Sequence, residues 1–306
     1  MQTPQTQHPK LANALGLSDV DLWLKREDKH RYGSHKGRSI PLMIKTYAKQ
    51  GFREFVISSS GNAALASIHS VIAHNSNNPD NKVSLRIFVG MNIDKKKLAL
   101  LQWEAGDGKR EAGISIDQVE RPKQSAFQFE KERPTKVKFL RQSTDDLALG
   151  GYASLADELA NIPNLSAIFV PTSSGTTAQA LGQTFLSKHG QVQIHIVQTN
   201  AIHPIAECIQ PSLLNKKKFH DEYSLASAIV DKVAHRKQSV KEIIESSGGA
   251  GWIISNDEIQ EVLTITKQTL RFPVSPNSAL SLAGLKKAIE SGWKPTGSVV
   301  CLLTGL

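Results

Sequence analysis

A lysine stands among small residues in the stretch RYGSHKGRS, residues 31–39. A lysine in such a setting can do several kinds of chemistry. Lys36 could bind phosphate in a P-loop, pair with Ser34 as a catalytic dyad, belong to a basic patch for nucleic acid, or form a Schiff base with an aldehyde. Each of these chemistries demands a particular spacing, so the neighbouring residues discriminate among them.

The spacing around Lys36 does not match the first three chemistries. A P-loop needs GxxxxGK[ST] directly after a strand, whereas the order here is GSHKGRS. Ser34 and Lys36 are two residues apart, so they do not share a helix face. A basic patch would need neither the flanking glycines nor the nearby acids Glu27 and Asp28. The remaining chemistry is that of an amine nucleophile, which must be desolvated and deprotonated before it attacks.

An amine of this kind needs an anion site elsewhere if its aldehyde partner carries a phosphate. The stretch PTSSGTTAQ, residues 171–179, has the composition of such a site, because hydroxyl residues and a glycine precede a helical pattern. Backbone N–H groups and hydroxyls at a helix N-terminus point at an anion. The residues concerned are Ser173, Ser174, Gly175, Thr176 and Thr177. Hydroxyl-rich helix starts are common, so this loop alone also fits an ordinary cap.

The elements that must position these residues follow from the hydrophobic pattern. Strands are predicted at 53–58, 84–90, 114–120, 166–171, 192–198 and 297–305. One helix is predicted at about 63–73, and a second, lysine-rich helix is predicted after the strand 84–90. Further helices are predicted at 152–162, 255–270 and 278–292. Strands that alternate with helices indicate an α/β class with a mostly parallel sheet and helices on both faces. The region 105–146 is the least regular, and we place a domain crossing near its end.

Ligands bind outside the carboxyl ends of the strands in such sheets. The segments SSSGNAA, PTSSGTTAQ and the final LTGL each follow a predicted strand, so they are expected at ligand-binding edges.

Composition bounds the class of protein. The 306 residues carry a net charge of +9, but basic residues are spread out and aromatic residues are scarce, so nucleic acid is not expected as a partner. No apolar run approaches the ~18 residues of a membrane span, and the polar start predicts no signal peptide. Cys208 and Cys301 form no CxxC pair, which fits a cytoplasmic protein without disulfides. His69, His195 and His203 lack ligand spacing, so no metal is expected.

Taken together and in order, these motifs resemble the fold-type II pyridoxal-5′-phosphate (PLP) enzymes, the tryptophan synthase β-like group. LWLKREDKHRYGSHKGRS is similar to the group's KxED…TGSFKxR motif, and SSSGNAALA is similar to its SSGNxAxA loop. VPTSSGTTAQAL stands where the phosphate loop stands, and SPNSALSLAGL resembles the segment before the last strand. VVCLLTG looks like the last strand of threonine synthases, which the chain resembles most within the group. The resemblance covers nearly the whole chain.

The resemblance implies two doubly wound α/β domains with mostly parallel sheets and a PLP site in the cleft between them. The smaller domain, on the substrate side, is expected at 42–145. The larger, PLP-binding domain is expected at 1–41 together with 146–306. The resemblance also implies a homodimer, and a small amino-acid substrate.

Roles carry over onto single residues. Lys36 would hold PLP as a Schiff base and move the proton of the substrate's α-carbon. Asn62 would hydrogen-bond the 3′-oxygen of the cofactor, and Thr304 would face its pyridine nitrogen. A neutral hydroxyl there makes the cofactor a milder electron sink, which suits elimination or replacement better than transamination. The substrate would contact His35, Ser59, Ser60 and Gly61, and the cofactor phosphate would contact Ser173, Ser174, Gly175, Thr176 and Thr177.

The chain departs from the family pattern next to the lysine. His35 replaces the usual phenylalanine, Gly37 the frequent aspartate, and RY the usual PT before Gly33. These changes bear on the substrate, because Tyr32 and His35 lie close to Lys36 in the sequence.

The implied activity is that of a PLP-dependent lyase in amino-acid biosynthesis, a threonine synthase that converts O-phosphohomoserine and water to threonine and phosphate. A serine/threonine ammonia-lyase and a cysteine-synthase-like β-replacement enzyme are alternatives on the same fold. A non-catalytic binding protein that kept the fold is an alternative from another class.

Overall fold

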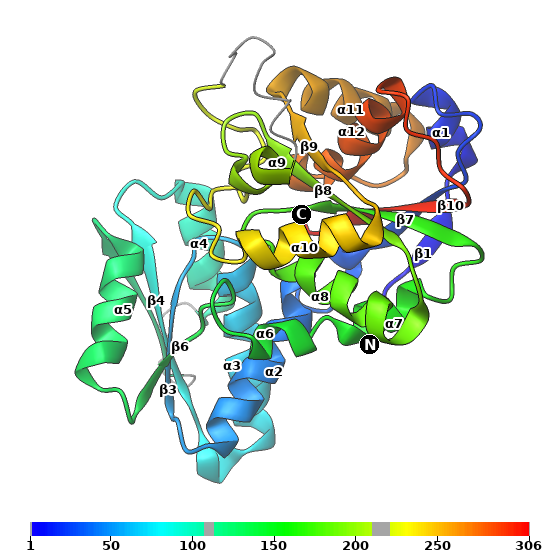
Figure 1. Ribbon diagram of the computed structural model, residues 1–306. Helices are drawn as coiled ribbons and strands as arrows, with labels where there is room; N and C mark the ends of the chain where they lie inside the picture. The colour runs from blue at the N-terminus through cyan, green and yellow to red at the C-terminus, as the bar shows by residue number, and fades with distance from the viewer. Residues whose placement is uncertain (1, 107–112, 210–220, 306) are drawn as a thin grey trace. The chain divides into compact units, whose positions relative to one another are not determined.

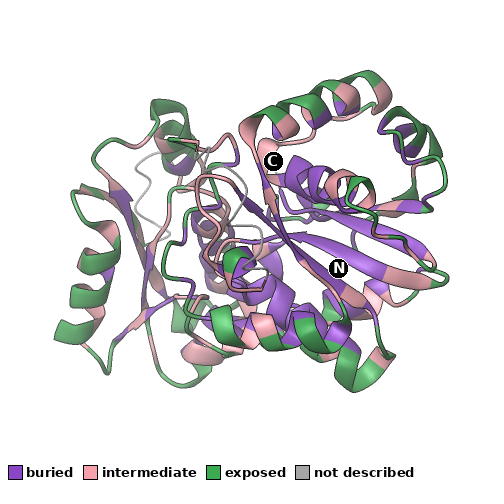
Figure 2. Cartoon of the chain, turned by 45° about the horizontal axis from the view of Figure 1, so that its top comes forward, coloured by how far each residue is buried: buried purple, intermediate pink, exposed green. Residues whose placement is uncertain are grey.

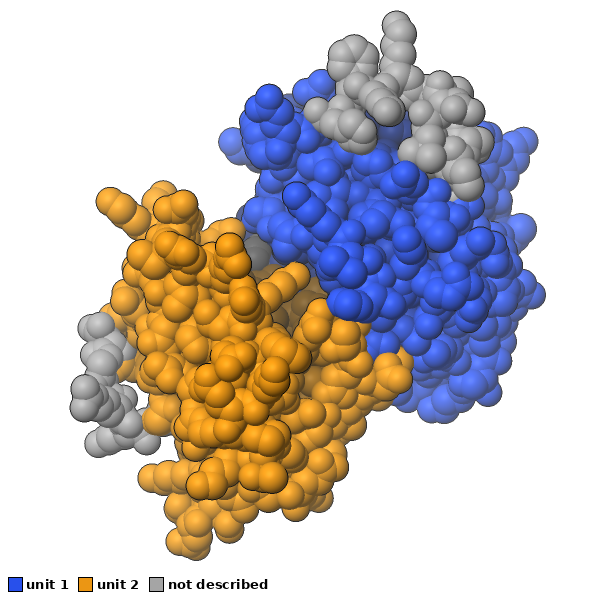
Figure 3. Space-filling model, turned by 60° about the vertical axis from the view of Figure 1, so that its left-hand side comes forward, with its two compact units in different colours: residues 1–30, 152–306 blue, residues 31–151 orange. Residues whose placement is uncertain are grey.

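The computed structural model describes residues 2–106, 113–209 and 221–305. The chain divides into two compact units, which Figure 3 distinguishes by colour. The larger unit comprises Met1–His30 and Tyr152–Leu306, and the smaller unit comprises Arg31–Gly151. Each unit has its own mostly parallel sheet, so the predicted α/β fold class is confirmed.

The observed division differs from the predicted domain limits of 42 and 145. The smaller unit begins at Arg31, so the segment around Lys36 belongs to it and not to the larger unit. The physical reason is packing, because α2 (Lys36–Lys49) packs against α3 (Asn62–Asn77) and α6 (Leu147–Gly150) of the same unit.

The larger unit contains a six-stranded sheet in the order β1-β2-β10-β7-β8-β9 (Figure 1). The strands are β1 (Gln5–Gln7), β2 (Leu22–Arg26), β7 (Leu165–Pro171), β8 (Gln193–Thr199), β9 (Gly251–Ile254) and β10 (Ser298–Leu303). β1 pairs antiparallel with β2, and the other neighbours pair in parallel. Every residue of β10 is buried, as a strand covered on both faces requires.

Helices cover both faces of this sheet (Figure 1). They are α1 (Pro9–Ala14), α7 (Ala153–Leu159), α8 (Thr176–Thr184), α9 (Pro204–Ile209), α10 (Lys237–Ser247), α11 (Asn256–Thr269) and α12 (Pro276–Glu290). The predicted start of α11 is confirmed, since Ser255 is its N-cap and forms a capping box with Glu258. Figure 2 shows the buried residues concentrated in the strands of the larger sheet and in the helices against them.

The smaller unit contains a four-stranded parallel sheet in the order β5-β4-β3-β6. The strands are β3 (Glu54–Ser58), β4 (Ser84–Gly90), β5 (Ile114–Val119) and β6 (Val137–Phe139). Phe55 and Ile57 of β3 pack in the core under α2 and α3, whereas Val56 faces the opposite core with Ala126 of α5 (Pro122–Glu132). α4 (Lys95–Glu104) packs against α3.

The region 105–146 is more regular than predicted, because it holds α5 and β6 in addition to the predicted strand β5. Of the residues of α5 only Ala126 is fully buried, so its apolar stripe is too narrow to stand out in the sequence. β6 has three residues, fewer than the pattern of a strand needs to be recognised. Residues 107–112 of this region lie outside the described residues.

The strand order reverses at one point in each sheet. From β7 the chain proceeds to β8 and β9 in one direction, while β10 lies on the other side of β7. From β3 the chain proceeds to β4 and β5, while β6 lies on the other side of β3. Parallel sheets bind ligands outside the carboxyl ends of strands at such switch points. The loops after β7, β10, β3 and β6 are therefore the first places to look for a site.

Within the described ranges, no helix is both long enough and apolar enough to cross a membrane.

The core of the larger unit contains a histidine that is held neutral. His195 of β8 stacks on Phe169 of β7 with ring centroids 4.4 Å apart. Its Nδ1 accepts a hydrogen bond of 3.2 Å from the indole N–H of Trp252, so its proton sits on Nε2, 3.3 Å from Gln193 Oε1. Burial lowers the pKa of His195 from 6.5 to about 3.

We therefore predict that folding stability falls as the pH drops from about 6.5 toward 3. In that window the unfolded chain binds a proton on His195 that the folded protein excludes, at a cost of up to ~1.4 kcal/mol per pH unit. Urea denaturation of the wild type and of His195→Gln from pH 7 to pH 4 measures this. The variant should show a shallower loss of stability with falling pH, and equal slopes would contradict the prediction.

Candidate functional site

Lys36 is the first residue of α2 and is half-buried. It follows a tight turn in which Gly33 has φ +74°, a left-handed conformation that favours glycine. The backbone N–H of Lys36 donates to Ser34 Oγ at 3.3 Å, and His35 before it is buried. A cation is electrostatically disfavoured at a helix N-terminus, so this lysine is not there to stabilise the helix.

An aromatic stack holds the turn before Lys36. The ring of Tyr32 lies 5.6 Å from that of His69 on α3, with an angle of 10° between the planes. His69 Nε2 lies 3.6 Å from a carboxylate oxygen of Glu104 at the end of α4. The guanidinium of Arg31 lies over the ring of Tyr32, 4.7 Å from the ring centre. The turn is thus attached to α3 and, through His69, to α4. The hydrophobic pattern of the sequence does not predict these contacts.

A second set of contacts holds α2 one turn beyond Lys36. Gln142, which follows β6, donates a hydrogen bond from its side chain to Ser39 Oγ. Gly151 approaches the same helix so closely that a Cβ there would lie 2.4 Å from Ser39 Cα. Neither Gln142 nor Gly151 was singled out from the sequence. The adjacent glycines Gly150 and Gly151 are the one local signal, since paired glycines often mark a close backbone approach.

The loop after β3 carries the remaining candidates of the smaller unit. Ser59 Oγ accepts from the N–H of Gly61 at 3.3 Å, and Gly61 is the N-cap of α3. Asn62 is therefore the first residue of the helix and not its cap, so capping does not explain it. Ser59, Gly61 and Asn62 are half-buried and Ser60 is exposed.

These residues lie at the same edge of the smaller sheet as Lys36. α2 leads into β3 and α3 leads out of it, so both helices start at the carboxyl end of the strands. The structure thus brings Lys36 and the segment Ser59 to Asn62 to the switch point of this sheet.

The loop after β7 turns on Gly175. Gly175 is the N-cap of α8 with φ +91°, and a Cβ on it would lie 2.6 Å from Val240 Cγ2 of α10. Only glycine fits both the left-handed backbone and the space. Ser174 Oγ lies 3.0 Å from Thr176 Oγ1, and Thr176 and Thr177 are buried. Hydroxyls and the first N–H groups of α8 therefore converge at one helix start.

A buried cation lies beside this helix start. Arg236 is 6% exposed, and its guanidinium donates to Gln179 Oε1 at 3.0 Å in the first turn of α8. Its positive charge and the N-terminus of α8 both favour an anion at the loop. The sequence offered no signal for Arg236, because it lies 57 residues from Gln179 in the chain.

Thr304 directly follows β10 and is 5% exposed. The next carbonyl, that of Gly305, accepts hydrogen bonds from Ser275 Oγ at 2.6 Å and Ser278 Oγ at 2.8 Å. Ser275 is the N-cap of α12, so the start of this helix holds the end of β10 in place.

β10 and β7 pair in register at Cys301 and Phe169. If this pairing continues for two more residues, Leu303 lies beside Pro171, the last residue of β7. Thr304 and Ser173 to Thr177 thus leave adjacent strands at the switch point of the larger sheet.

The predicted residues therefore form two sets, one in each unit. The smaller unit holds His35, Lys36, Ser59, Ser60, Gly61 and Asn62, and the larger unit holds Ser173, Ser174, Gly175, Thr176, Thr177 and Thr304. Among the residues that the structure describes, no cluster of His, Cys, Asp and Glu side chains could hold a metal ion.

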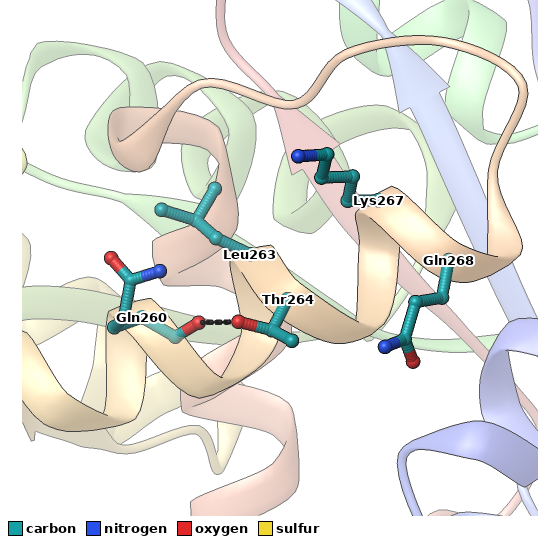
Figure 4. Close-up of a pocket in the computed structure, with 5 residues that line it drawn as sticks. All are labelled: Gln260, Leu263, Thr264, Lys267 and Gln268. Atoms are coloured by element: carbon teal, nitrogen blue, oxygen red, sulfur yellow. Dashed lines mark hydrogen bonds between the residues drawn. The ribbon is translucent and has the colours of Figure 1, made fainter.

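A hollow along α11 involves none of these residues (Figure 4). A single helix lines it, through Gln260, Leu263, Thr264, Lys267 and Gln268. The Thr264 hydroxyl donates to the Gln260 carbonyl at 2.9 Å, within the helix itself. This hollow is a feature of the helix surface and does not gather polar groups from several elements, as ligand sites do.

Known proteins are similar to this chain along nearly its whole length. The family model described as "Pyridoxal-phosphate dependent enzyme" matches residues 1–305. Threonine synthase of Methanocaldococcus jannaschii is 24% identical over 320 residues, which cover 99% of this chain and 74% of that protein. Threonine synthase of Mycobacterium leprae is 24% identical over 310 residues, which cover 99% of this chain and 80% of that protein.

Solved structures share the fold. A pyridoxal 5'-phosphate-dependent aspartate racemase matches with a TM-score of 0.81 at 18% identity, over 100% of this chain and 90% of that one. The processed form of threonine deaminase isoform 2 from Solanum lycopersicum matches with a TM-score of 0.77 at 16% identity, over 100% and 79%. At these identities the likeness concerns the fold alone.

We predict that Gly175→Ala destabilises the protein more than Gly292→Ala. The two glycines have nearly the same φ, +91° and +92°, but no atom lies within 4 Å of a Cβ on Gly292. The left-handed backbone should cost about 1–2 kcal/mol in both variants. Contact with Val240 should add about 1–3 kcal/mol in Gly175→Ala alone. Urea denaturation of both variants measures the difference, and equal losses would show that the loop has room to relax.

Proposed function

Because the chain belongs to the family of pyridoxal-phosphate-dependent enzymes, we propose that it catalyses elimination and replacement on an amino acid, as a threonine synthase. The substrate in this proposal is O-phosphohomoserine, and water replaces the phosphate to give threonine. The observation that carries the proposal is the similarity to threonine synthases along 99% of this chain.

The residues fit the cofactor of the family, pyridoxal 5'-phosphate. We assign the covalent attachment of the cofactor aldehyde to the amine of Lys36. The phosphate is assigned to the hydroxyls and N–H groups of Ser173 to Thr177, a stretch without a carboxylate that would repel it. Asn62 is assigned to the 3′-oxygen and Thr304 to the pyridine nitrogen. The donor set is thus an amine, an anion cradle at a helix start and two neutral polar side chains.

When bound, the cofactor withdraws electrons from the bonds at the substrate's α-carbon. Lys36 takes the α-proton and returns protons along the chain of the substrate, as general base and acid. The substrate carboxylate is assigned to Ser59, Ser60 and Gly61 at the start of α3, because a helix N-terminus favours an anion. His35, adjacent to Lys36, contacts the substrate.

Thr304 sets the balance between reactions. A hydroxyl does not keep a pyridine nitrogen protonated as a carboxylate would, so electron withdrawal is weaker. Weaker withdrawal favours elimination and replacement over transamination. The hydrogen bonds from Ser275 and Ser278 to the Gly305 carbonyl support this role, because they fix the position of the backbone next to Thr304.

We also propose that the protein acts as a homodimer in the cytoplasm. Light scattering of the purified protein tests the oligomeric state.

We predict that the PLP-loaded protein has a visible absorption band that depends on Lys36. Lys36→Ala should lose this band, and turnover should fall by about 10²- to 10⁴-fold or more, since both attachment and proton transfer are removed. Lys49→Ala, at the other end of α2, is the matched control and should retain the band. A band of normal intensity in Lys36→Ala would remove this lysine from its assigned role.

The reaction itself is tested with O-phosphohomoserine. Release of phosphate and formation of threonine by the PLP-loaded protein are the expected outcome. Formation of a 2-oxo acid from serine or threonine instead would make the protein an ammonia-lyase. Consumption of acetylated serine would make it a β-replacement enzyme. A protein that holds no PLP would be a binding protein with the same fold.

A further inference from the structure

An irregular segment packs against the candidate phosphate loop. Residues 221–236, here called the strap, lead into α10. Side-chain oxygens of other elements hold its backbone: Asn256 Oδ1 accepts from Leu225 N at 2.9 Å, and Asn277 Oδ1 accepts from Ala228 N at 2.9 Å. Ser173 Oγ is a third such oxygen, and it belongs to residues 173–177, here called the phosphate loop.

Ser173 Oγ accepts two hydrogen bonds from the strap. The N–H groups of Val230 and Asp231 both lie at 3.2 Å from it. A serine hydroxyl has two lone pairs and one proton. Both acceptor positions of the Ser173 hydroxyl are therefore occupied, so this side chain can contact an anion only by donating its single O–H.

The adjacent serine is engaged differently. Ser174 Oγ lies 3.0 Å from Thr176 Oγ1, so its hydrogen bond stays inside the loop. Ser173 thus links the loop to another segment, while Ser174 belongs to the loop alone. The two serines form a natural pair of test and control.

The part of the strap that Ser173 holds is itself ordered. Asp231 is 8% exposed, and its Oδ1 accepts from the N–H groups of Val233 and Ala234 at 3.2 Å. Ile229 and Ala234 are buried, whereas Val230 and Val233 are 56% and 64% exposed. The strap therefore presents two apolar side chains outward beside the phosphate loop, and the bonds to Ser173 fix where they lie.

We infer that Ser173 is a positioning residue that couples the strap to the anion bound at the phosphate loop. This inference rests on the proposed placement of the cofactor phosphate at residues 173–177. When the O–H of Ser173 donates to the phosphate, its lone pairs are fixed toward Val230 and Asp231. Donation to an anion also polarises the hydroxyl and strengthens the bonds that it accepts.

The coupling must act in both directions. If the strap improves phosphate binding, phosphate binding stabilises the strap by the same free energy. The strap also reaches the start of α12 through Asn277, next to Ser275 and Ser278, which hold Gly305. One segment therefore connects the loop after β7 with the end of β10, the two places assigned to the cofactor in the larger unit.

Amide hydrogen exchange at Val230 and Asp231 tests the coupling without reference to activity. In the wild type, saturation with PLP should slow exchange at both amides. In Ser173→Ala exchange should be fast with and without PLP, and PLP should bind about 10-fold more weakly or worse, as expected for one lost hydrogen bond to a charged group. Ser173→Thr, which keeps the hydroxyl, should restore protection.

Ser174→Ala is the matched control. It should weaken PLP binding, yet at saturating PLP the two strap amides should be as protected as in the wild type. Exchange at Val230 and Asp231 that ignores PLP in the wild type, or PLP-dependent protection that persists in Ser173→Ala, would overturn the inference. The wild-type comparison decides the matter even if Ser173→Ala fails to fold.

The outcomes separate this inference from the proposed reaction. A wild-type protein that binds no PLP would refute both. PLP binding with strap protection but without phosphate release from O-phosphohomoserine would refute the reaction and leave the coupling in place.

Discussion

The larger unit depends on the pairing of β10 with β2 on one side and with β7 on the other. β2 lies near the start of the chain and β7 in its middle, and all six residues of β10 are buried between them. The same pairing creates the switch point, because β8 and β9 extend the sheet on the other side of β7. Thr304 and the loop of Gly175 leave adjacent strands as a direct consequence.

Serine hydroxyls then fix the backbone at these edges, since Ser275 and Ser278 hold the carbonyl of Gly305 and Ser173 holds the strap. In the smaller unit Ser39 Oγ accepts from the side chain of Gln142, one turn beyond the start of α2. A short hydroxyl side chain loses little conformational entropy when it is ordered, so it is an economical way to define a position. Both sets of candidate residues are thus supported by hydrogen bonds from elements distant in the chain.

The lysine of the smaller unit depends on close packing as well. α2 is held before Lys36 by the stack of Tyr32 on His69, and after it by Gln142 and the approach of Gly151. These contacts explain why the segment around Lys36 belongs to the smaller unit. The predicted boundary at residue 42 had assigned this segment to the larger unit. An amine that must meet a carbonyl in a defined geometry needs a support of this kind.

The sequence by itself determined the fold class, most of the strands and the family, because alternating apolar runs and ordered motifs are local features. It also identified Lys36, Asn62 and the hydroxyl loop as candidates, whose roles stay predictions. It did not reveal α5 and β6, whose apolar patterns are too narrow or too short. Only the tertiary structure decided the contacts of Ser39 with Gln142 and of Ser173 with Val230, which join residues 103 and 57 positions apart. No local pattern encodes such pairs, since strand order and packing bring them together.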